Sequence, residues 1–131
     1  GNSESGWPCH GMEHALSAYY DITHGEGLAI ITPRWMKHIL NEKTVDRFVK
    51  YGVNVFGIDA SLDKMTIADK AIDETYKFFE SINIPMHLKD VGIDEVRIDE
   101  MAKHVADNEG LENAWAPLLQ EDIAAIFRAS L

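Results

Sequence analysis

The sequence predicts an all-α fold, a bundle of about five to six helices, and three observations support this class. Apolar residues recur three and four positions apart along most of the chain, which is the period of amphipathic helices. Glycine and proline fall where such helices would begin or end. No segment is a convincing strand. The four consecutive apolar residues 28–31 also fit a short buried strand, but the nearby Pro33 favours a helix.

The first half of the chain is expected to hold three helices. Residues 1–6 are polar and predicted to be flexible, and residues 7–131 are predicted to form one helical domain. Pro8 suits the first turn of a helix, because its missing N–H costs nothing there. Asn41 is expected to cap the third helix. The expected elements are a helix over 9–20, a turn over 21–26, a helix over 28–40 and a helix ended by Gly57.

The second half contains the clearest helical pattern, from about Leu62 to Ser81, with one apolar and one charged face. Ile84-Pro85 is expected to close this helix, because the residue before a proline avoids helical angles. The remaining expected elements are a loop over 86–91, a turn near Asp94, a helix over about 97–106, a loop around Ala116-Pro117 and a helix over 120–130.

Composition limits the classes of function. The 131 residues carry a net charge of −10, which argues against nucleic acid and anionic membrane as partners. No apolar run approaches the eighteen residues of a membrane span, and the first residues do not resemble a signal peptide. The single cysteine, Cys9, excludes an intramolecular disulfide. A cytoplasmic, reducing location fits these features best.

Three of the six histidines, His10, His14 and His24, lie within fifteen residues. His10 and His14 are four apart and share one face of a helix. His24 opens His-Gly-Glu-Gly, in which the two glycines permit a tight turn or a close backbone approach. Imidazole pairs at this spacing with a third histidine are a plausible metal site. The alternative, surface or hydrogen-bonded histidines, stays open on spacing alone.

Residues 10–14 also match H-x-x-E-H, a zinc-protease signature in which two histidines bind metal and Glu13 would be the base. Five-residue patterns with two free positions often arise by chance, and no edge strand is predicted to hold a peptide substrate. The other three histidines are scattered and expected to be exposed or locally bonded: His38, His87 and His104.

The segment HGMEHALSAYYDITHGEGLAIITPRWM, beginning at His10, closely resembles the C-terminal helical domain of iron-containing alcohol dehydrogenases, particularly their butanol dehydrogenase branch. The likeness continues, more weakly, through Ile84-Pro85-Met86-His87-Leu88, Gly92-Ile93 and the helix after Pro117. It therefore extends over essentially the whole chain. Leu119 departs from the family, whose members usually place a helix-capping Thr or Ser there.

The resemblance implies an oxidoreductase that interconverts a small alcohol and aldehyde, with Fe²⁺ (or Zn²⁺) and NAD(P)H as cofactors of the complete enzyme. Its metal would polarise the alcohol oxygen, and hydride would pass to the nicotinamide. By position, His10 and His24 correspond to two of the metal ligands. His14 corresponds to the histidine near the nicotinamide and substrate, a catalytic and cofactor-binding role.

Two parts of that enzyme have no counterpart in the sequence: the dinucleotide-binding domain, and an Asp and a His four residues apart that supply the other ligands. The resemblance therefore predicts a C-terminal part of the enzyme, inactive alone, with no tightly bound cofactor and with apolar helix faces that favour self-association. A non-catalytic helical interaction module is the alternative. The substrate, the choice of NAD or NADP and the native metal are not fixed by these residues.

Overall fold

The computed structural model describes residues 9–20, 23–109, 111 and 116–131; the side chains of residues 9, 10, 14, 17 and 24 lie outside this description. Over the described residues the fold is all-α, as predicted, with no strand, and the strand alternative for residues 28–31 is wrong. The α-helices are α1 (Cys9–Tyr19), α2 (His24–Ile39), α3 (Val45–Phe56), α4 (Lys64–Ser81), α5 (Ile98–Asn108) and α6 (Gln120–Ala129), and the 3₁₀ helices are η1 (Leu88–Val91) and η2 (Glu95–Arg97).

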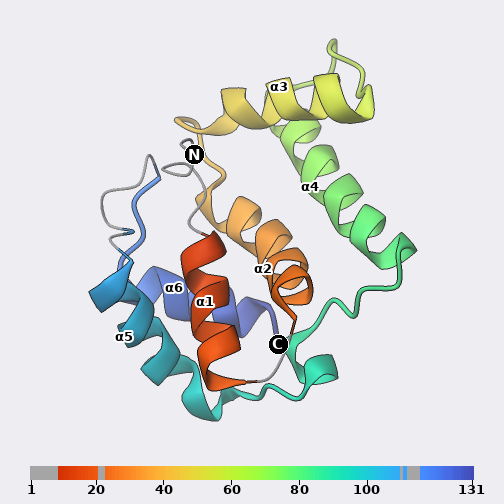
Figure 1. Ribbon diagram of the computed structural model, residues 1–131. Coiled ribbons are helices and arrows are strands. Elements are labelled where there is room, and N and C mark those ends of the chain that lie inside the picture. The colour runs from red at the N-terminus through yellow and green to blue at the C-terminus, as the bar shows by residue number, and fades with distance from the viewer. Residues whose placement is uncertain (1–8, 21–22, 110, 112–115) are drawn as a thin grey trace.

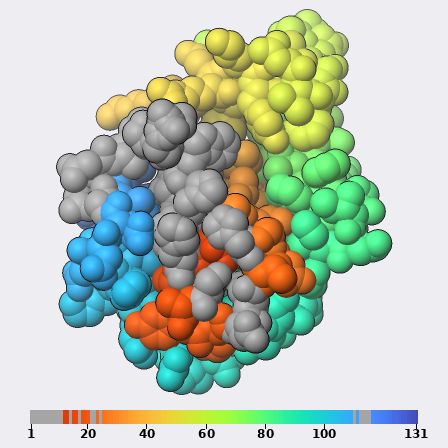
Figure 2. Space-filling view, viewed as in Figure 1, coloured from red at the N-terminus to blue at the C-terminus, as the bar shows by residue number. Residues whose placement is uncertain are grey.

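Helix α2 is the central element. It packs against α1 on one side, α4 on another and α6 on a third (Figure 1). Helices α1, α2, α5 and α6 enclose most of the core, while α3 and α4 pair as a hairpin that forms one end of the molecule (Figures 1 and 2). The hairpin α1–α2 therefore lies inside the bundle, and the hairpin α3–α4 extends from it.

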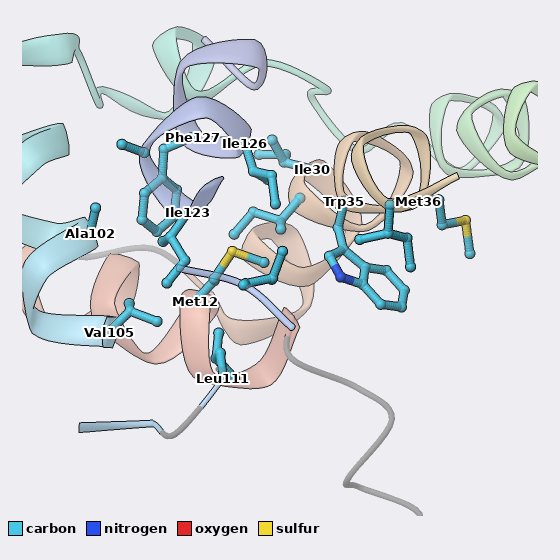
Figure 3. Close-up of a cluster of buried hydrophobic side chains, with 14 of the residues drawn as sticks. Met12, Ile30, Trp35, Met36, Ala102, Val105, Leu111, Ile123, Ile126 and Phe127 are labelled. Carbon is cyan, nitrogen blue, oxygen red and sulfur yellow. The ribbon is translucent and has the colours of Figure 1, made fainter. Parts of the chain in front are cut away.

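The core joins α1 and α2 to the two C-terminal helices. Figure 3 shows Met12, Trp35 and Ile123 in one continuous apolar cluster. Removing such side chains from water is the main favourable contribution to folding. The largest side chains with no solvent exposure include Met12, Leu16, Ile30, Ile31, Met101, Ile123, Ile126 and Phe127.

Proline is accommodated inside α2, as the helical interpretation of this segment requires. Pro33 lacks an N–H and would be expected to kink or end a helix, yet α2 continues to Ile39. Two side chains donate to carbonyl groups of the neighbouring turn: Thr32 Oγ1 to Leu28 O at 2.6 Å and Arg34 Nη1 to Ile30 O at 3.1 Å. Both bonds lie in the turns around the proline.

The beginning of α3 differs from the prediction. Asn41 does not cap the helix; its Oδ1 accepts from the N–H groups of Lys43 and Thr44, at 2.8 and 3.1 Å, and forms a turn before α3. Thr44 occupies the N-cap position. Gly57 ends α3 as predicted, with a φ of 65° that a residue with a side chain rarely adopts.

The C-terminal segments close over the bundle. The predicted loop 86–91 contains η1, and Leu88 N–H donates to Ser130 O at 2.7 Å, which ties this loop to the end of α6. Leu119 occupies the N-cap of α6 without a side-chain acceptor, while Asp122 Oδ2 accepts from Leu119 N–H at 2.9 Å. Among the described residues, no helix is long and apolar enough to cross a membrane.

Candidate metal centre

The three histidines of the predicted site lie on the two helices of one hairpin. His10 is the second residue of α1, His14 follows one turn later, and His24 is the first residue of α2. Their side chains are outside the described part of the structure, so their roles stay predictions. What the structure does describe is the framework that carries them.

Helix α2 begins at His24, four residues before the predicted start, and the predicted turn over residues 21–26 is correspondingly too long. The reason is Thr23, which caps the helix: its Oγ1 accepts from Glu26 N–H at 3.2 Å and donates to Glu26 Oε1 at 3.0 Å. Thr-x-x-Glu is the sequence signature of a capping box. Residues 23–26 therefore carry the sequence signal for this helix start.

Gly27 lies within the first turns of α2, so a close backbone approach, and not a tight turn, explains this glycine. A methyl group at position 27 would lie 2.6 Å from Cγ and 2.8 Å from Oε2 of Glu13. Such separations are far inside van der Waals contact. The glycine therefore makes room for the Glu13 side chain between α1 and α2. At Gly25 a methyl group would meet nothing within 4 Å.

Glu13 is the residue that the H-x-x-E-H pattern would make the general base. Its exposed fraction is 0%, although carboxylates are rarely fully buried. A general base in a metallohydrolase has to reach water and substrate. A carboxylate enclosed between two helices does not meet that requirement, which argues against the H-x-x-E-H interpretation.

The side of α1 that bears Met12, Ala15 and Leu16 is part of the core. Met12, Ala15 and Leu16 have no exposure, and Trp35 of α2 is 3% exposed. Figure 3 shows Met12 and Trp35 in the buried apolar cluster. Met12 and Trp35 are therefore packing residues and not the lining of an open pocket. Both helices that carry the candidate ligands are held by this packing, and a site built on helices is more rigid than one built on loops.

The three remaining histidines are exposed, as predicted, and each lies near a polar side chain. His38 Nε2 lies 3.0 Å from Asp122 Oδ1, which links the end of α2 to the start of α6. His87 Nε2 lies 3.5 Å from Tyr76 Oη, and His104 Nδ1 lies 3.5 Å from Asn108 Nδ2. Among the described residues, no three histidine, cysteine or carboxylate side chains form a group able to hold a metal ion.

The C-terminal end of α1 contacts η2 and α5 through a cluster of polar side chains. The Tyr19 ring packs edge-on against His104, with centroids 6.0 Å apart, and the Arg97 guanidinium lies 5.5 Å from the Tyr19 ring centroid. Partial burial, together with the neighbouring Glu100 carboxylate, raises the pKa of Tyr19 above its usual value. These contacts fix the C-terminal end of α1.

Comparison with known proteins shows to which family these helices belong. The sequence profile of the Fe-containing alcohol dehydrogenase family, C-terminal part, matches residues 2–131. The chain belongs to the iron-containing alcohol dehydrogenase family. This confirms the resemblance deduced from the segment that begins at His10.

Relatives agree in sequence and in structure. NADH-dependent butanol dehydrogenases A and B of Clostridium acetobutylicum are 50% and 47% identical, over 95% and 98% of the chain. The structure of NADH-dependent butanol dehydrogenase A of Thermotoga maritima superposes with a TM-score of 0.80, at 32% identity and over 95% of the chain. That of a 1,3-propanediol oxidoreductase gives 0.83 at 28% identity. The chain spans about a third of the length of these proteins, 32% and 33% of the two butanol dehydrogenases.

Proposed function

We propose that these residues form the metal-binding helical domain, residues 7–131, of an iron-dependent, NAD(P)-linked alcohol dehydrogenase acting on small alcohols and aldehydes. The observation that carries the proposal is the 50% identity to a butanol dehydrogenase over 95% of the chain. Because the chain spans only about a third of that protein, the dehydrogenase activity is proposed for the complete enzyme.

In this proposal His10 and His24 are metal ligands, and His14 lies beside the nicotinamide and substrate. Neutral imidazole suits both Fe²⁺ and Zn²⁺, so the donor set fits the metal that the family implies. When bound, the metal would supply a Lewis acid for the substrate oxygen. The chain's own contribution is to hold two imidazoles on adjacent, core-anchored helices and to keep the side of α1 behind them free of water.

Metal titration tests the ligand assignment. Co²⁺ is a suitable probe, because its absorption spectrum reports coordination, and Fe²⁺ and Zn²⁺ can then be compared with it. We expect weak binding by the 131-residue chain, because the sequence offers no Asp and His four residues apart. His10→Ala and His24→Ala should each abolish this binding, whereas His104→Ala, at an exposed and locally bonded histidine, should not change it. Equal affinity in all four proteins would overturn the assignment.

An activity assay tests whether the 131-residue chain has dehydrogenase activity without the rest of the complete enzyme. We expect no oxidation of NADH or NADPH with butanal by the 131-residue chain, since the family's Asp and His ligands, four residues apart, and its dinucleotide site have no counterpart among these residues. Turnover that depends on added metal would contradict this division. Loss of that turnover in His14→Ala would then locate the catalytic machinery within α1.

A further inference from the structure

We propose that a cleft between α2 and α4 binds a free α-amino acid with an apolar side chain. In this site Arg34 and Lys37 of α2 hold the carboxylate, and Asp69 of α4 holds the ammonium group. Arg34 lies about 15 Å along the helix axis from the first residue of α2, at a rise of about 1.5 Å per residue. The cleft is therefore apart from the start of α2, and the inference does not depend on the proposed function.

The cleft opens between two helices that pack against each other, α2 and α4 (Figure 1). Its volume is about 400 Å³, and small-molecule sites typically measure about 300–1,000 Å³. Its apolar lining comes from Pro33 and Ile72, which are buried, and from the half-buried Tyr76. A ligand with an apolar part can therefore remove that part from water here.

Arg34 is already held in place beside the cleft. Its guanidinium carbon lies 4.9 Å from the centroid of the Tyr76 ring, and its Nη1 donates to Ile30 O at 3.1 Å. A guanidinium group carries five N–H donors in a planar fork, which matches the two oxygens of a carboxylate. Because the ring and the carbonyl group already order this side chain, it loses little conformational entropy when it binds an anion.

The charged side chains that line the cleft have opposite signs on its two helices. Arg34 and Lys37 come from α2, whereas Asp69 and Asp73 come from α4. Asp73 pairs along its own helix with Lys77, at 3.1 Å. Among the described residues, no ion pair joins the two cations of α2 to the two carboxylates of α4. Charges of both signs that face one cleft without neutralising each other are complementary to a ligand that carries both signs.

A ligand of one sign fits this cleft less well. A simple anion would be attracted by Arg34 and Lys37 but would also meet two carboxylates, on a chain with a net charge of −10. A simple cation would meet Arg34, whose position is fixed. An α-amino acid carries a carboxylate and an ammonium group on one carbon, together with a side chain suited to the apolar lining. It is the class of small molecule that satisfies all three features.

Titration of the ¹⁵N-labelled 131-residue chain with L-leucine and with L-phenylalanine tests the site. We expect saturable changes in the amide signals of residues 34–37 and 69–76. Leucinamide lacks the carboxylate and N-acetyl-leucine lacks the ammonium group, so each should bind about tenfold more weakly than L-leucine, because each loses a charge-assisted hydrogen bond. Equal binding of either analogue would overturn the zwitterion assignment. Changes that saturate with neither amino acid would overturn the site, as expected if Lys37 and Asp69 pair only with each other in solution.

Substitutions test whether binding occurs in this cleft. Lys37→Met and Asp69→Asn should each weaken L-leucine binding about tenfold. Lys50→Met and Asp90→Asn are matched controls, because these side chains are also exposed but do not line the cleft, and they should leave the affinity unchanged. Far-UV circular dichroism checks that each variant is folded. Wild-type affinity in both cleft variants would overturn the proposal, and so would an equal loss in the control variants, which would attribute binding to overall charge.

Discussion

Each of the two helix hairpins of this domain has a glycine where its helices meet, but the side chains that face the glycine differ. In α3–α4 a methyl group on Gly52 would lie 3.1 Å from Ala71 Cβ and 3.3 Å from Ile67 Cγ2, an apolar contact. In α1–α2 the group facing Gly27 is the carboxylate of Glu13. Packing explains the first crossing completely. The second encloses a carboxyl group that packing alone would not select, and this hairpin also carries the proposed ligands His10 and His24.

The two hairpins also differ in how far their apolar side chains are exposed to solvent. The inner face of α1 is closed, with Leu16 at 0% exposure. Phe78 of α4 and Ile82, the residue that caps its C-terminal end, are about half exposed, at 53% and 52%. Large exposed apolar side chains often mark contact surfaces, and the expected self-association of the chain stays a prediction for this region. The hairpin α1–α2 is built for rigidity, and the outer face of α3–α4 tolerates change.

Truncating one apolar side chain in each hairpin tests this contrast with the largest expected effect. Leu16→Ala should lower the free energy of unfolding by about 2–5 kcal/mol, because it opens a cavity in the closed core. Phe78→Ala should change it by less than about 1 kcal/mol, since half of this ring is already in water. Urea unfolding measures both. A cost for Phe78→Ala equal to that of Leu16→Ala would remove the distinction.

Alanine at the two glycines compares the crossings directly. Gly27→Ala should destabilise the chain by about 1–3 kcal/mol, because its methyl group overlaps Glu13 atoms that have no open space to move into. Gly52→Ala should stay within about 1 kcal/mol of wild type, because alanine's helix propensity offsets a tight contact of a few tenths of an ångström. Thermal and urea unfolding provide the measurement.

A double-mutant cycle shows whether the Glu13 side chain is the cause. If it is, Glu13→Ala removes the overlapping atoms, and Gly27→Ala should then cost much less than in the wild type. Such coupling is expected between residues in contact. Additive effects of the two substitutions would mean that the strain at position 27 arises elsewhere.

The helix caps give a comparison of moderate size. Thr23→Ala and Asp63→Ala each remove an acceptor from a helix start, since Asp63 Oδ2 accepts from the N–H groups of Met65 and Thr66 at 3.1 and 3.3 Å. Each should cost about 1 kcal/mol. Only Thr23→Ala should also weaken Co²⁺ binding, because fraying of α2 begins at His24. An equal loss of Co²⁺ affinity in Asp63→Ala would show that general destabilisation is sufficient.

Most helices were predictable because apolar residues recur along them at helical spacing. The period of apolar residues located α4 to within two residues of its observed start, and Gly57 correctly ended α3. Helix starts were less accurate, since several polar residues can cap a helix and the hydrogen bonds decide between them. Asn41 was expected to cap α3 and instead forms the preceding turn. Thr23 was not expected to cap α2, although Thr-x-x-Glu is present.

The site was predictable only in part, for a different physical reason. Spacing placed His10 and His14 on one helix face, but their assignment as ligand and catalytic residue came from the family resemblance. The burial of Glu13 could not be read from the sequence, because it depends on Gly27, fourteen positions away on another helix. Contacts between helices decide the role of a carboxylate, and local patterns do not contain them.

The smallest expected effect is a pH dependence in the loop of the α3–α4 hairpin. Asp59 Oδ1 accepts from the backbone N–H of Ser61 at 2.9 Å and from its hydroxyl at 2.8 Å, and these bonds lower the pKa of Asp59. A carboxyl group with a lowered folded-state pKa stabilises the fold above its unfolded value of about 3.9, and that contribution is lost as the pH falls through the lower folded value. Asp59→Asn should therefore be less stable than wild type at neutral pH, and this difference should shrink in acid, as urea unfolding at several pH values would measure. A stability difference that stays constant with pH would show that the charge of Asp59 does not stabilise this hairpin.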